Sequence, residues 1–589
     1  MKQKYFIYVT LIFFLSLFLN ISGSWWAGPD KNRLKLVGDK ELVEALSEEM
    51  VKSREELYSG IQYYDQEQKY EDREIKIFLQ NNKTIKVKRT LLDAVRSFLL
   101  RSYAPDEQAT LKALSNMKPS RLDFNPGFFV YGGLYLYLIA IFLKVLSIAG
   151  IVKLVPDISY YFLHPEQMGI IFTAGKIFGA IFTSLTVYLI YRAGCLLYTR
   201  RAGLISAFLF SITPAVVAWS HYLNPYTFTF FWLLLSFCIC IKLFENELPG
   251  YYILAGLSTG LTAGSLSTYG FIIFAVPVIH FMKNYSRGIK RAFFSLLDKR
   301  MWLALLFSII GFLMVNPYWI ASFRQVLNEF KKAGEYYRFT PHPFRWFIYL
   351  RYTVMSMLGF PLWLVAMCGV LYAFFKRRKE DILLIFLLLP PLIYFASSMT
   401  RFMHYGLYII PFLLLLTGRL LDSWLKKSEN RFLWITGIFV IAIITFYTFS
   451  YTLAINLAAM RENTRSLAGK WVNENIPEGT GIGMPEIPSP WRTPPFRYLD
   501  YRMVITYWDT QILAREKPEY FIVSEYQWLR GYGYKNMLSY LREYEEVKKF
   551  EYFPDILGLK FKRDKNSPWD WPDFNPQILI FRRRQNEKN

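Results

Sequence analysis

Residues 103–129 read YAPDEQATLKALSNMKPSRLDFNPGFF. Two adjacent carboxylates, Asp106 and Glu107, follow directly after a proline in this segment, and long apolar stretches lie on both sides of it. Charge is costly where a chain enters or leaves a bilayer, so acids in such a position mark function. The segment therefore predicts a functional site at a membrane surface.

The composition is that of a membrane protein. Of the 589 residues, 53% are hydrophobic and 19% are aromatic, and residues 5–21, 303–315 and 434–449 form charge-free runs. Such runs predict bilayer-spanning helices of about 20 residues. The first run is followed by two tryptophans after Ser24 and lacks a small-residue cleavage site. We expect it to be a retained anchor and not a signal peptide.

The formal net charge of +23 fits this class of protein. Basic residues of polytopic proteins collect in cytoplasmic loops and near anionic head groups, so we favour this explanation over nucleic-acid binding. The cysteines lie within or beside predicted spans, so we expect no disulfide framework outside the membrane. They are Cys195, Cys238, Cys240 and Cys368.

The basic loops orient the chain. Residues 128–146 are apolar and aromatic, and they form either a short span or a helix at the membrane interface. If this helix is interfacial, the basic loops at residues 283–300, 376–379 and 419–431 all fall on the cytoplasmic side. If it spans, all of them face outward, against the positive-inside rule. We therefore expect the interfacial placement.

This choice predicts a polytopic α-helical membrane protein with about eleven transmembrane helices, a cytoplasmic N-terminus and an extracytoplasmic C-terminus. We expect it in the cell (plasma) membrane, with large external loops at residues 22–167 and 320–346. The first loop contains amphipathic stretches at residues 41–57 and 90–100. The spans that follow it are expected at residues 168–191, 204–222 and 226–244, and then as a short pair at 251–264 and 269–281.

The composition becomes polar in the last part of the chain. Residues 1–455 are expected to form the transmembrane domain, and residues 456–589 an extracytoplasmic α/β domain. In the second part the patterns predict strands near residues 480–484, 520–523 and 578–581, and helices at 463–475 and 537–544.

An acidic pair at the outer surface suits the transfer of a sugar from a polyprenyl phosphate. The carrier phosphate is already a leaving group, so the protein must deprotonate an acceptor hydroxyl and hold the departing phosphate with cations. Asp106 and Glu107 supply the carboxylate. The candidate cations near the outer ends of spans are Lys176, Arg401, His404, Arg338 and His342.

Each of these residues also has a plainer interpretation. Asp106 and Glu107 precede a good helical sequence, where acids cap the helix or favour its positive end, and both roles are compatible. Lys176 is also of the kind that extends toward lipid head groups. The three tyrosines at residues 131, 135 and 137 favour an interfacial aromatic belt over a sugar-stacking surface.

Two segments resemble a known family. The PDE at residues 105–107 is followed by NPGFFVYGGLYLYLIA at residues 125–140, and later by RFMHYGLYIIPFLLLLTGRLLD at residues 401–422. This arrangement resembles the GT-C superfamily, in particular the dolichyl-phosphate-mannose protein mannosyltransferase-like branch that includes bacterial aminoarabinose transferases. The resemblance implies that Asp106 acts as the base with Glu107 in support, and that a large external loop and an extracytoplasmic C-terminal domain are present.

The chain also departs from that family. Lys176 stands where relatives often have arginine, and His404–Tyr405 stands where many have Arg-Tyr. The second external turn holds His221 and Asn224 where relatives often have an acid, so it lacks an Asp-x-Asp pair for a divalent ion. The resemblance then implies contacts to substrate or phosphate from these residues, and an enzyme that needs no metal or other cofactor.

The sequence thus predicts an inverting hexosyl- or pentosyltransferase that uses a polyprenyl-phosphate sugar at the outer membrane face. The acceptor is a protein, a glycan or a lipid, and nucleic acid is not expected as a partner. A transporter or lipid flippase with an external accessory domain is the alternative, and it predicts acids or broken helices at mid-membrane depth in two matching halves.

Overall fold

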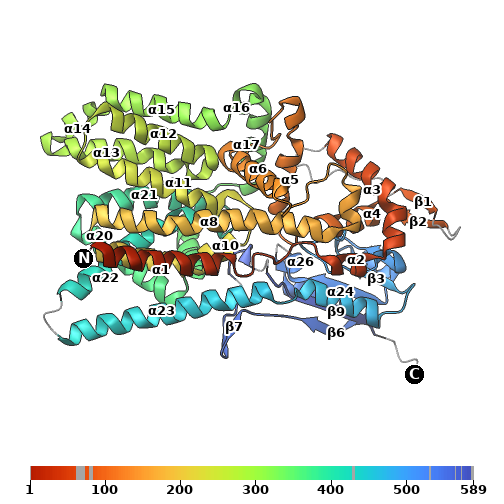
Figure 1. Cartoon of the computed structure of the whole chain (residues 1–589). Coiled ribbons are helices and arrows are strands. Elements are labelled where there is room, and N and C mark those ends of the chain that lie inside the picture. The colour runs from red at the N-terminus through yellow and green to blue at the C-terminus, as the bar shows by residue number, and fades with distance from the viewer. Residues whose placement is uncertain are drawn as a thin grey trace.

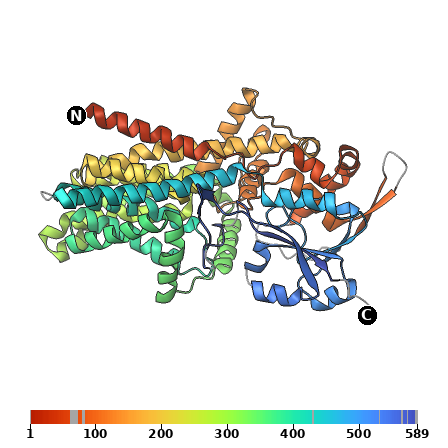
Figure 2. The same cartoon turned by 90° about the horizontal axis from the view of Figure 1, so that it is seen from below.

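The computed structural model describes residues 2–60, 73–78, 84–427, 431–529, 532–563, 566–571 and 574–584. Long helices run side by side through one half of the molecule, and a sheet with shorter helices forms the other half (Figures 1 and 2). The two chain ends lie at opposite ends of this arrangement (Figure 1). The acidic segment joins the two halves.

The first half consists of apolar helices, several of which lie in the runs and spans that the sequence predicts. They are α1 (Lys2–Ile21), α8 (Pro165–Leu197), α9 (Arg200–Ser211), α10 (Pro214–Ser220), α11 (Pro225–Ile241), α12 (Pro249–Ser265), α13 (Ala275–Asn284), α15 (Lys299–Val315), α20 (Phe360–Lys376), α21 (Lys379–Ala396), α22 (Ile410–Lys427) and α23 (Arg431–Met460). Within the described residues, 5 helices are long and apolar enough to cross a membrane, or 6 if α9 and α10 form one span. The count of about eleven stays a prediction that rests on the charge rule.

One predicted span is broken. The sequence suggests a single helix over residues 204–222, but α9 ends at Ser211 and α10 starts at Pro214, with a bend of 52° between them. Pro214 has no N–H to donate and suits the first position of a new helix, so the break falls where the residue type favours it. The prediction of one continuous span at this place is wrong.

The segment at residues 22–167, which the sequence predicts to be external and which is called the first external segment below, is mostly helical. It contains α2 (Lys31–Val37), α3 (Lys40–Gly60), α4 (Arg89–Leu100), α5 (Glu107–Asn116), α6 (Gly133–Ile148) and α7 (Ser159–Leu163), with an antiparallel hairpin of β1 (Glu74–Phe78) and β2 (Thr84–Lys88). Helices α3 and α4 confirm the two amphipathic stretches. Helix α6 begins five residues later than the predicted apolar stretch and leaves Ile141, Val145 and Ile148 exposed. This apolar surface fits contact with lipid.

The segment around residues 320–346, which the sequence predicts to be external and which is called the second external segment below, is also folded. It consists of α16 (Tyr318–Ala321), α17 (Phe323–Tyr337), α18 (Pro343–Ile348), a π-helical stretch (Tyr349–Val354) and α19 (Met355–Leu358). Glu329 of α17 accepts hydrogen bonds from the backbone N–H of Phe129 at 2.8 Å and from Gln325 at 3.1 Å. Gln325 also donates to the carbonyl of Gly127 at 3.0 Å. These bonds hold α17 against the end of the acidic segment.

The last part of the chain builds a five-stranded sheet. Its strands are β3 (Gly481–Met484), β4 (Arg502–Ile505), β5 (Tyr520–Ser524), β6 (Tyr544–Phe550) and β9 (Ile578–Arg583), in the order β4-β3-β5-β9-β6. Strands β4, β3 and β5 are parallel, and β9 is antiparallel to both neighbours. A separate short hairpin contains β7 (Asp555–Ile556) and β8 (Leu559–Lys560).

Helices accompany this sheet. They are α24 (Thr464–Asn475), α25 (Thr510–Glu516), α26 (Glu525–Leu529) and α27 (Tyr534–Tyr540). Helix α24 confirms the helix predicted at residues 463–475, and the Asn463 side chain caps it by accepting from the backbone N–H of Arg465. The predicted helix at 537–544 has the wrong bounds, because α27 ends at Tyr540 and Tyr544 already belongs to β6.

The sheet and the first external segment share one hydrophobic core. Phe98 of α4 stacks on Tyr498 with ring centroids 5.6 Å apart, and both side chains are fully buried. Ile482 and Ile580 of the sheet belong to the same buried cluster. Burial of apolar side chains from segments almost 400 positions apart fixes the first external segment on the C-terminal sheet.

Candidate functional site

Glu107 and Lys176 form a buried ion pair at the centre of the candidate site. The Lys176 Nζ lies 3.1 Å from the Glu107 Oε1, and neither side chain is exposed to solvent. Lys176 stands about three turns into α8 and not in its first turns, because the helix begins at Pro165, earlier than the predicted span. Because Lys176 is buried and paired with Glu107, its ammonium group is not exposed to a ligand in solvent.

Backbone groups complete the surroundings of the pair. The Lys176 ammonium also donates to the Trp26 carbonyl at 2.8 Å, and the Leu223 N–H donates to the Glu107 Oε1 at 3.1 Å. Thr110 of α5 donates to the Leu223 carbonyl at 3.1 Å. The Glu107 Oε2 is buried without a hydrogen-bond partner. The pair thus links α5 and α8 to two loops. One is the loop between α1 and α2 that contains Trp26, called the Trp26 loop below, and the other is the turn between α10 and α11.

Glycine allows the Trp26 loop to lie directly on α8. A Cβ atom built on Gly169 would lie 2.1 Å from the Pro29 carbonyl oxygen, which is far inside van der Waals contact. Glycine at this position permits the close approach that brings the Trp26 carbonyl to Lys176.

Asp106 has a different environment from its neighbour. It occupies the N-cap position of α5, but its side chain makes no capping hydrogen bond, so the predicted side-chain cap is not formed. The residue is half-buried, whereas Glu107 is fully buried. Burial raises the pKa of Tyr337 at the end of α17, and the negative charge of Asp106 adds to that shift. Asp106 therefore lies close enough to the end of α17 for its charge to affect Tyr337, and it is partly open to solvent.

His404 is held by a residue that sequence patterns did not single out. Its Nδ1 lies 3.0 Å from a carboxylate oxygen of Asp570, which also accepts from the backbone N–H groups of Met403 and His404. Both side chains are buried. The aromatic sequence around Asp570 is the only signal for this contact, and it carries no spacing that predicts a partner.

Arg401 and Tyr405, which flank His404 in the sequence, have different surroundings. The Arg401 guanidinium donates to the Asn566 carbonyl at 3.3 Å, and the Arg401 carbonyl accepts from the Trp569 N–H at 3.0 Å. Tyr405 is buried and stacks on Phe395, and its ring lies 5.2 Å from that of Tyr337. Tyr405 thus packs beside Tyr337, whereas Arg401 contacts the C-terminal segment.

His221 and Asn224 form the turn between α10 and α11, and both are buried. Burial lowers the pKa of His221 to about 3, so its imidazole is neutral at physiological pH. Its Nε2 lies 3.3 Å from the Leu19 carbonyl, while its Nδ1 has no partner. The Asn224 side chain caps α11 by accepting from the backbone N–H of Tyr226 at 3.1 Å. The structure brings this turn to the Glu107–Lys176 pair.

Arg338 and His342 lie on the exposed second external segment. Arg338 ends α17 with a positive φ of 41°, and the His342 Nδ1 caps α18 by accepting from the Phe344 N–H at 3.2 Å. Neither residue contacts the buried pair. Among the described residues, no group of three or more His, Cys, Asp or Glu side chains is arranged to hold a metal.

Comparison with known proteins gives one family match. Residues 169–320 match the model of the dolichyl-phosphate-mannose-protein mannosyltransferase family. The resemblance to GT-C membrane glycosyltransferases is confirmed. The matched residues include Lys176, His221 and Asn224 of the site. None of the curated proteins matches the chain.

Several solved structures align with this chain at low identity. The Archaeoglobus fulgidus oligosaccharyltransferase tethered with an acceptor peptide is 12% identical with a TM-score of 0.39, over 67% of this chain and 61% of that chain. The chain thus spans less than two thirds of that enzyme. AglB from the same organism, in complex with an inhibitory peptide and a dolichol-phosphate, is 12% identical with a TM-score of 0.40, over 76% and 67%. ArnT from Cupriavidus metallidurans, bound to undecaprenyl phosphate, is 12% identical with a TM-score of 0.43, over 83% and 95%.

Proposed function

We propose that the protein moves a sugar from a polyprenyl-phosphate carrier to an acceptor hydroxyl at the outer face of the plasma membrane. The described helices include several that are long and apolar enough to cross a membrane. The matched family is named for a dolichyl-phosphate sugar, which is a donor of this chemical class. The observation that carries the proposal is the contrast between two consecutive acids, Glu107 buried against Lys176 and Asp106 half-exposed.

This contrast assigns the roles of the two acids. Glu107 is neutralised by the Lys176 ammonium at 3.1 Å and is shielded from any substrate by full burial. The contacts of Glu107 fix the start of α5, and thereby the backbone of Asp106, the acid that precedes it. Asp106 is partly open to solvent, so its carboxylate is the one of the two that a ligand can reach. A positioned carboxylate of this kind is suited to act as a general base.

The proposed reaction is a single displacement. The acceptor oxygen attacks the anomeric carbon of the sugar, its proton passes to the Asp106 carboxylate, and the bond from the anomeric carbon to the phosphate oxygen breaks. The polyprenyl phosphate leaves with the bonding electrons, and the configuration of the anomeric carbon is inverted. No metal is required in this scheme, since cationic side chains near the site supply the positive charge that the phosphate needs.

The candidates for that charge are not equivalent. Lys176 is committed to Glu107, and His404 is committed to Asp570. Arg338 and His342 are exposed on the second external segment, which α17 anchors beside the acidic segment. We therefore place the phosphate on the side of Arg338, His342 and Tyr337, with Arg401 as a further candidate.

The proposal is tested by direct transfer. Purified full-length protein is incubated with polyprenyl-phosphate sugars labelled in the sugar, together with protein, glycan and lipid acceptors in parallel. We expect label to move to one acceptor class with inversion at the anomeric carbon. Retention of configuration, or movement of intact lipid-linked sugar across vesicles without transfer, contradicts the proposal.

A further inference from the structure

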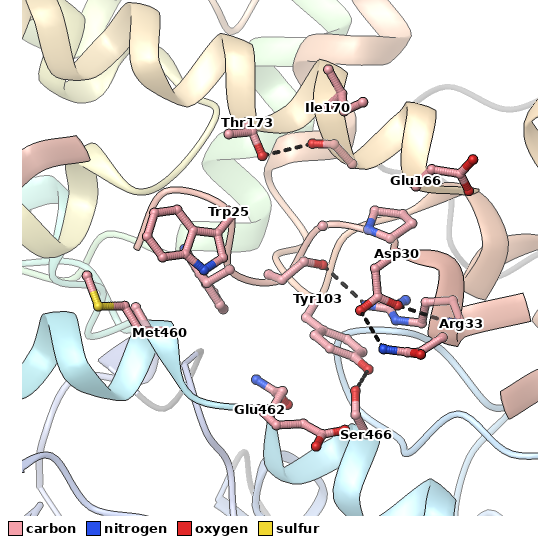
Figure 3. A pocket seen from close by; sticks show the side chains of 18 of the residues that line it. Trp25, Asp30, Arg33, Tyr103, Glu166, Ile170, Thr173, Met460, Glu462 and Ser466 are labelled. Atoms are coloured by element: carbon pink, nitrogen blue, oxygen red, sulfur yellow. Dashed lines mark hydrogen bonds between the residues drawn. The ribbon is translucent and has the colours of Figure 1, made fainter. Parts of the chain in front are cut away.

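A large cavity lies on the other side of the Trp26 loop from Lys176. It has a volume of about 800 Å³ and is enclosed by the loop at residues 25–33, the first half of α8, and the junction of α23 with α24. This volume is within the range of binding sites for small molecules. Figure 3 shows Trp25 and Met460 at one side of the cavity, and Asp30, Arg33 and Glu166 at the other.

The cavity presents aromatic rings together with hydrogen-bonding groups. Trp25, Trp26, Tyr103 and Phe574 contribute rings, and Trp25 is 54% exposed. The polar groups beside them are the side chains of Asp30, Asn32, Glu166, Glu462, Asn463 and Ser466. Sugars have apolar C–H faces that stack on such rings, and hydroxyl groups that donate to carboxylates and amides. The lining thus has the chemistry of a carbohydrate site.

The basic groups of the cavity are already engaged. Arg33 is buried, donates to the carbonyls of Phe98 and Ala27, and lies 3.7 Å over the ring of Tyr103. The Lys470 Nζ lies 2.6 Å from a carboxylate oxygen of Glu462. The third, Arg461, lies over the ring of Tyr552. The lining also holds three carboxylates, those of Asp30, Glu166 and Glu462, which offset its three basic side chains, so it favours an uncharged head group over an anionic one.

One wall of the cavity is apolar. Phe142, Leu146, Ile170 and Ile177 line it. Phe142 and Leu146 belong to α6, whose Ile141, Val145 and Ile148 are exposed on the surface of the molecule. An apolar wall that continues into an exposed apolar surface suits a chain that enters from lipid.

The cavity also lies close to the proposed base. Tyr103 lines it and precedes Asp106 by three residues, so the two Cα atoms are at most about 11 Å apart. Tyr103 is fixed there, because its hydroxyl lies 2.6 Å from that of Ser466, as Figure 3 shows. A head group of more than one sugar ring has the length to join the cavity to Asp106.

We propose that this cavity binds the head group of a lipid-anchored carbohydrate and that this glycolipid is the acceptor of the transfer. The sugar stacks on Trp25 and is held by Asp30, Asn32 and Glu462, while the lipid chain leaves along α6 and Ile170. This assignment rests on the proposed function and adds the class of acceptor to it. It places the acceptor and the donor phosphate on opposite sides of the Glu107–Lys176 pair.

Photocrosslinking tests the assignment without requiring transfer. The full-length protein is placed in phosphatidylcholine nanodiscs that contain either a diglycosyl diacylglycerol or phosphatidylglycerol, each with a photoactivatable acyl chain. We expect the glycolipid to label peptides from residues 25–33, 142–151 and 166–177, and phosphatidylglycerol to label them at least about fivefold less. Unlabelled diglycosyl diacylglycerol should compete, and phosphatidylglycerol should not.

Variants show whether the label reports this cavity. Trp25→Ala removes a stacking ring and Ile170→Trp fills the apolar wall, and each should lower glycolipid labelling about three- to tenfold. Trp434→Ala removes a comparably exposed tryptophan at the far end of α23 and should not change it. Equal labelling by both lipids, or labelling that neither variant lowers, overturns the inference.

The outcome is separable from that of the proposed function. Asp106→Asn should bind the glycolipid as the wild type does while it fails to transfer sugar. Transfer that depends on Asp106 without selective glycolipid labelling refutes the acceptor assignment alone. Selective labelling with no transfer to any acceptor instead refutes the proposed function, and the cavity is then a glycolipid site of another kind.

Discussion

The buried pair of Glu107 and Lys176 makes the sharpest prediction about the architecture of the site. The two charges lie 3.1 Å apart and both side chains are fully buried. At an effective dielectric constant of 20, charges at this separation attract each other by about 5 kcal/mol. Much of that attraction offsets the loss of hydration that burial imposes on both groups.

Removing one partner is therefore expected to destabilise the protein more than removing both. Glu107→Gln keeps an acceptor for the Leu223 N–H but leaves the ammonium uncompensated, and Lys176→Met leaves the carboxylate uncompensated. Each single substitution should cost about 3–5 kcal/mol, and the double substitution should recover at least half of the summed loss. The difference between the summed losses of the single variants and the loss of the double variant measures the interaction energy of Glu107 with Lys176.

Thermal unfolding of the purified protein in detergent, followed by size-exclusion chromatography, gives the ranking of the four proteins. Glu49→Gln and Lys52→Met form a matched cycle on an exposed pair with a 3.0 Å separation, and they should leave the midpoint unchanged. Losses that simply add at Glu107 and Lys176, or single variants as stable as the wild type, refute the reasoning.

Three further predictions follow from neighbouring contacts. His221 has a pKa of about 3 in the folded protein against an ordinary value near 6.5, so between these values the unfolded state binds one more proton than the folded state, and stability should rise with pH. His221→Gln should remove about 2 kcal/mol of this rise between pH 5 and 7. Thermal midpoints measured against pH for both proteins test this. Asp570→Ala removes the carboxylate oxygen that accepts three hydrogen bonds from Met403 and His404, and limited proteolysis should then cut near residues 566–571 at a rate at least about tenfold above the wild type. Gly169→Ala places a Cβ 2.1 Å from the Pro29 carbonyl and should cost about 1–3 kcal/mol in a thermal unfolding assay, whereas Gly179→Ala on the same helix meets nothing nearer than 3.6 Å and should be neutral.

The sequence predicts well those elements whose burial pattern is local. Helix α8 follows from its apolar run, and α24 follows from the helical pattern of its sequence. The break between α9 and α10 carries a local signal in Pro214 that hydropathy alone overrides. The hairpin of β1 and β2, which is not among the predicted elements, has one too, since TIKVK alternates strictly and EIKIF alternates up to its last residue.

The candidate site is harder to predict, because it is built from contacts between distant segments. Lys176 has the features of a phosphate contact by its position on a span, but the fold pairs it with an acid 69 positions earlier. Asp570 acquires its meaning only when the C-terminal segment meets His404. A single sequence shows that an acid or a lysine is costly in such surroundings, but not which partner compensates it.

The most direct test of the central claim is the single-turnover rate of Asp106→Asn with the donor and acceptor that the wild type uses. Asparagine keeps the size of the half-exposed side chain and cannot accept the proton, so thermal stability should be unchanged. The rate should fall by at least about 100-fold if the carboxylate is the base. A variant that folds and transfers sugar at a rate near that of the wild type contradicts the account.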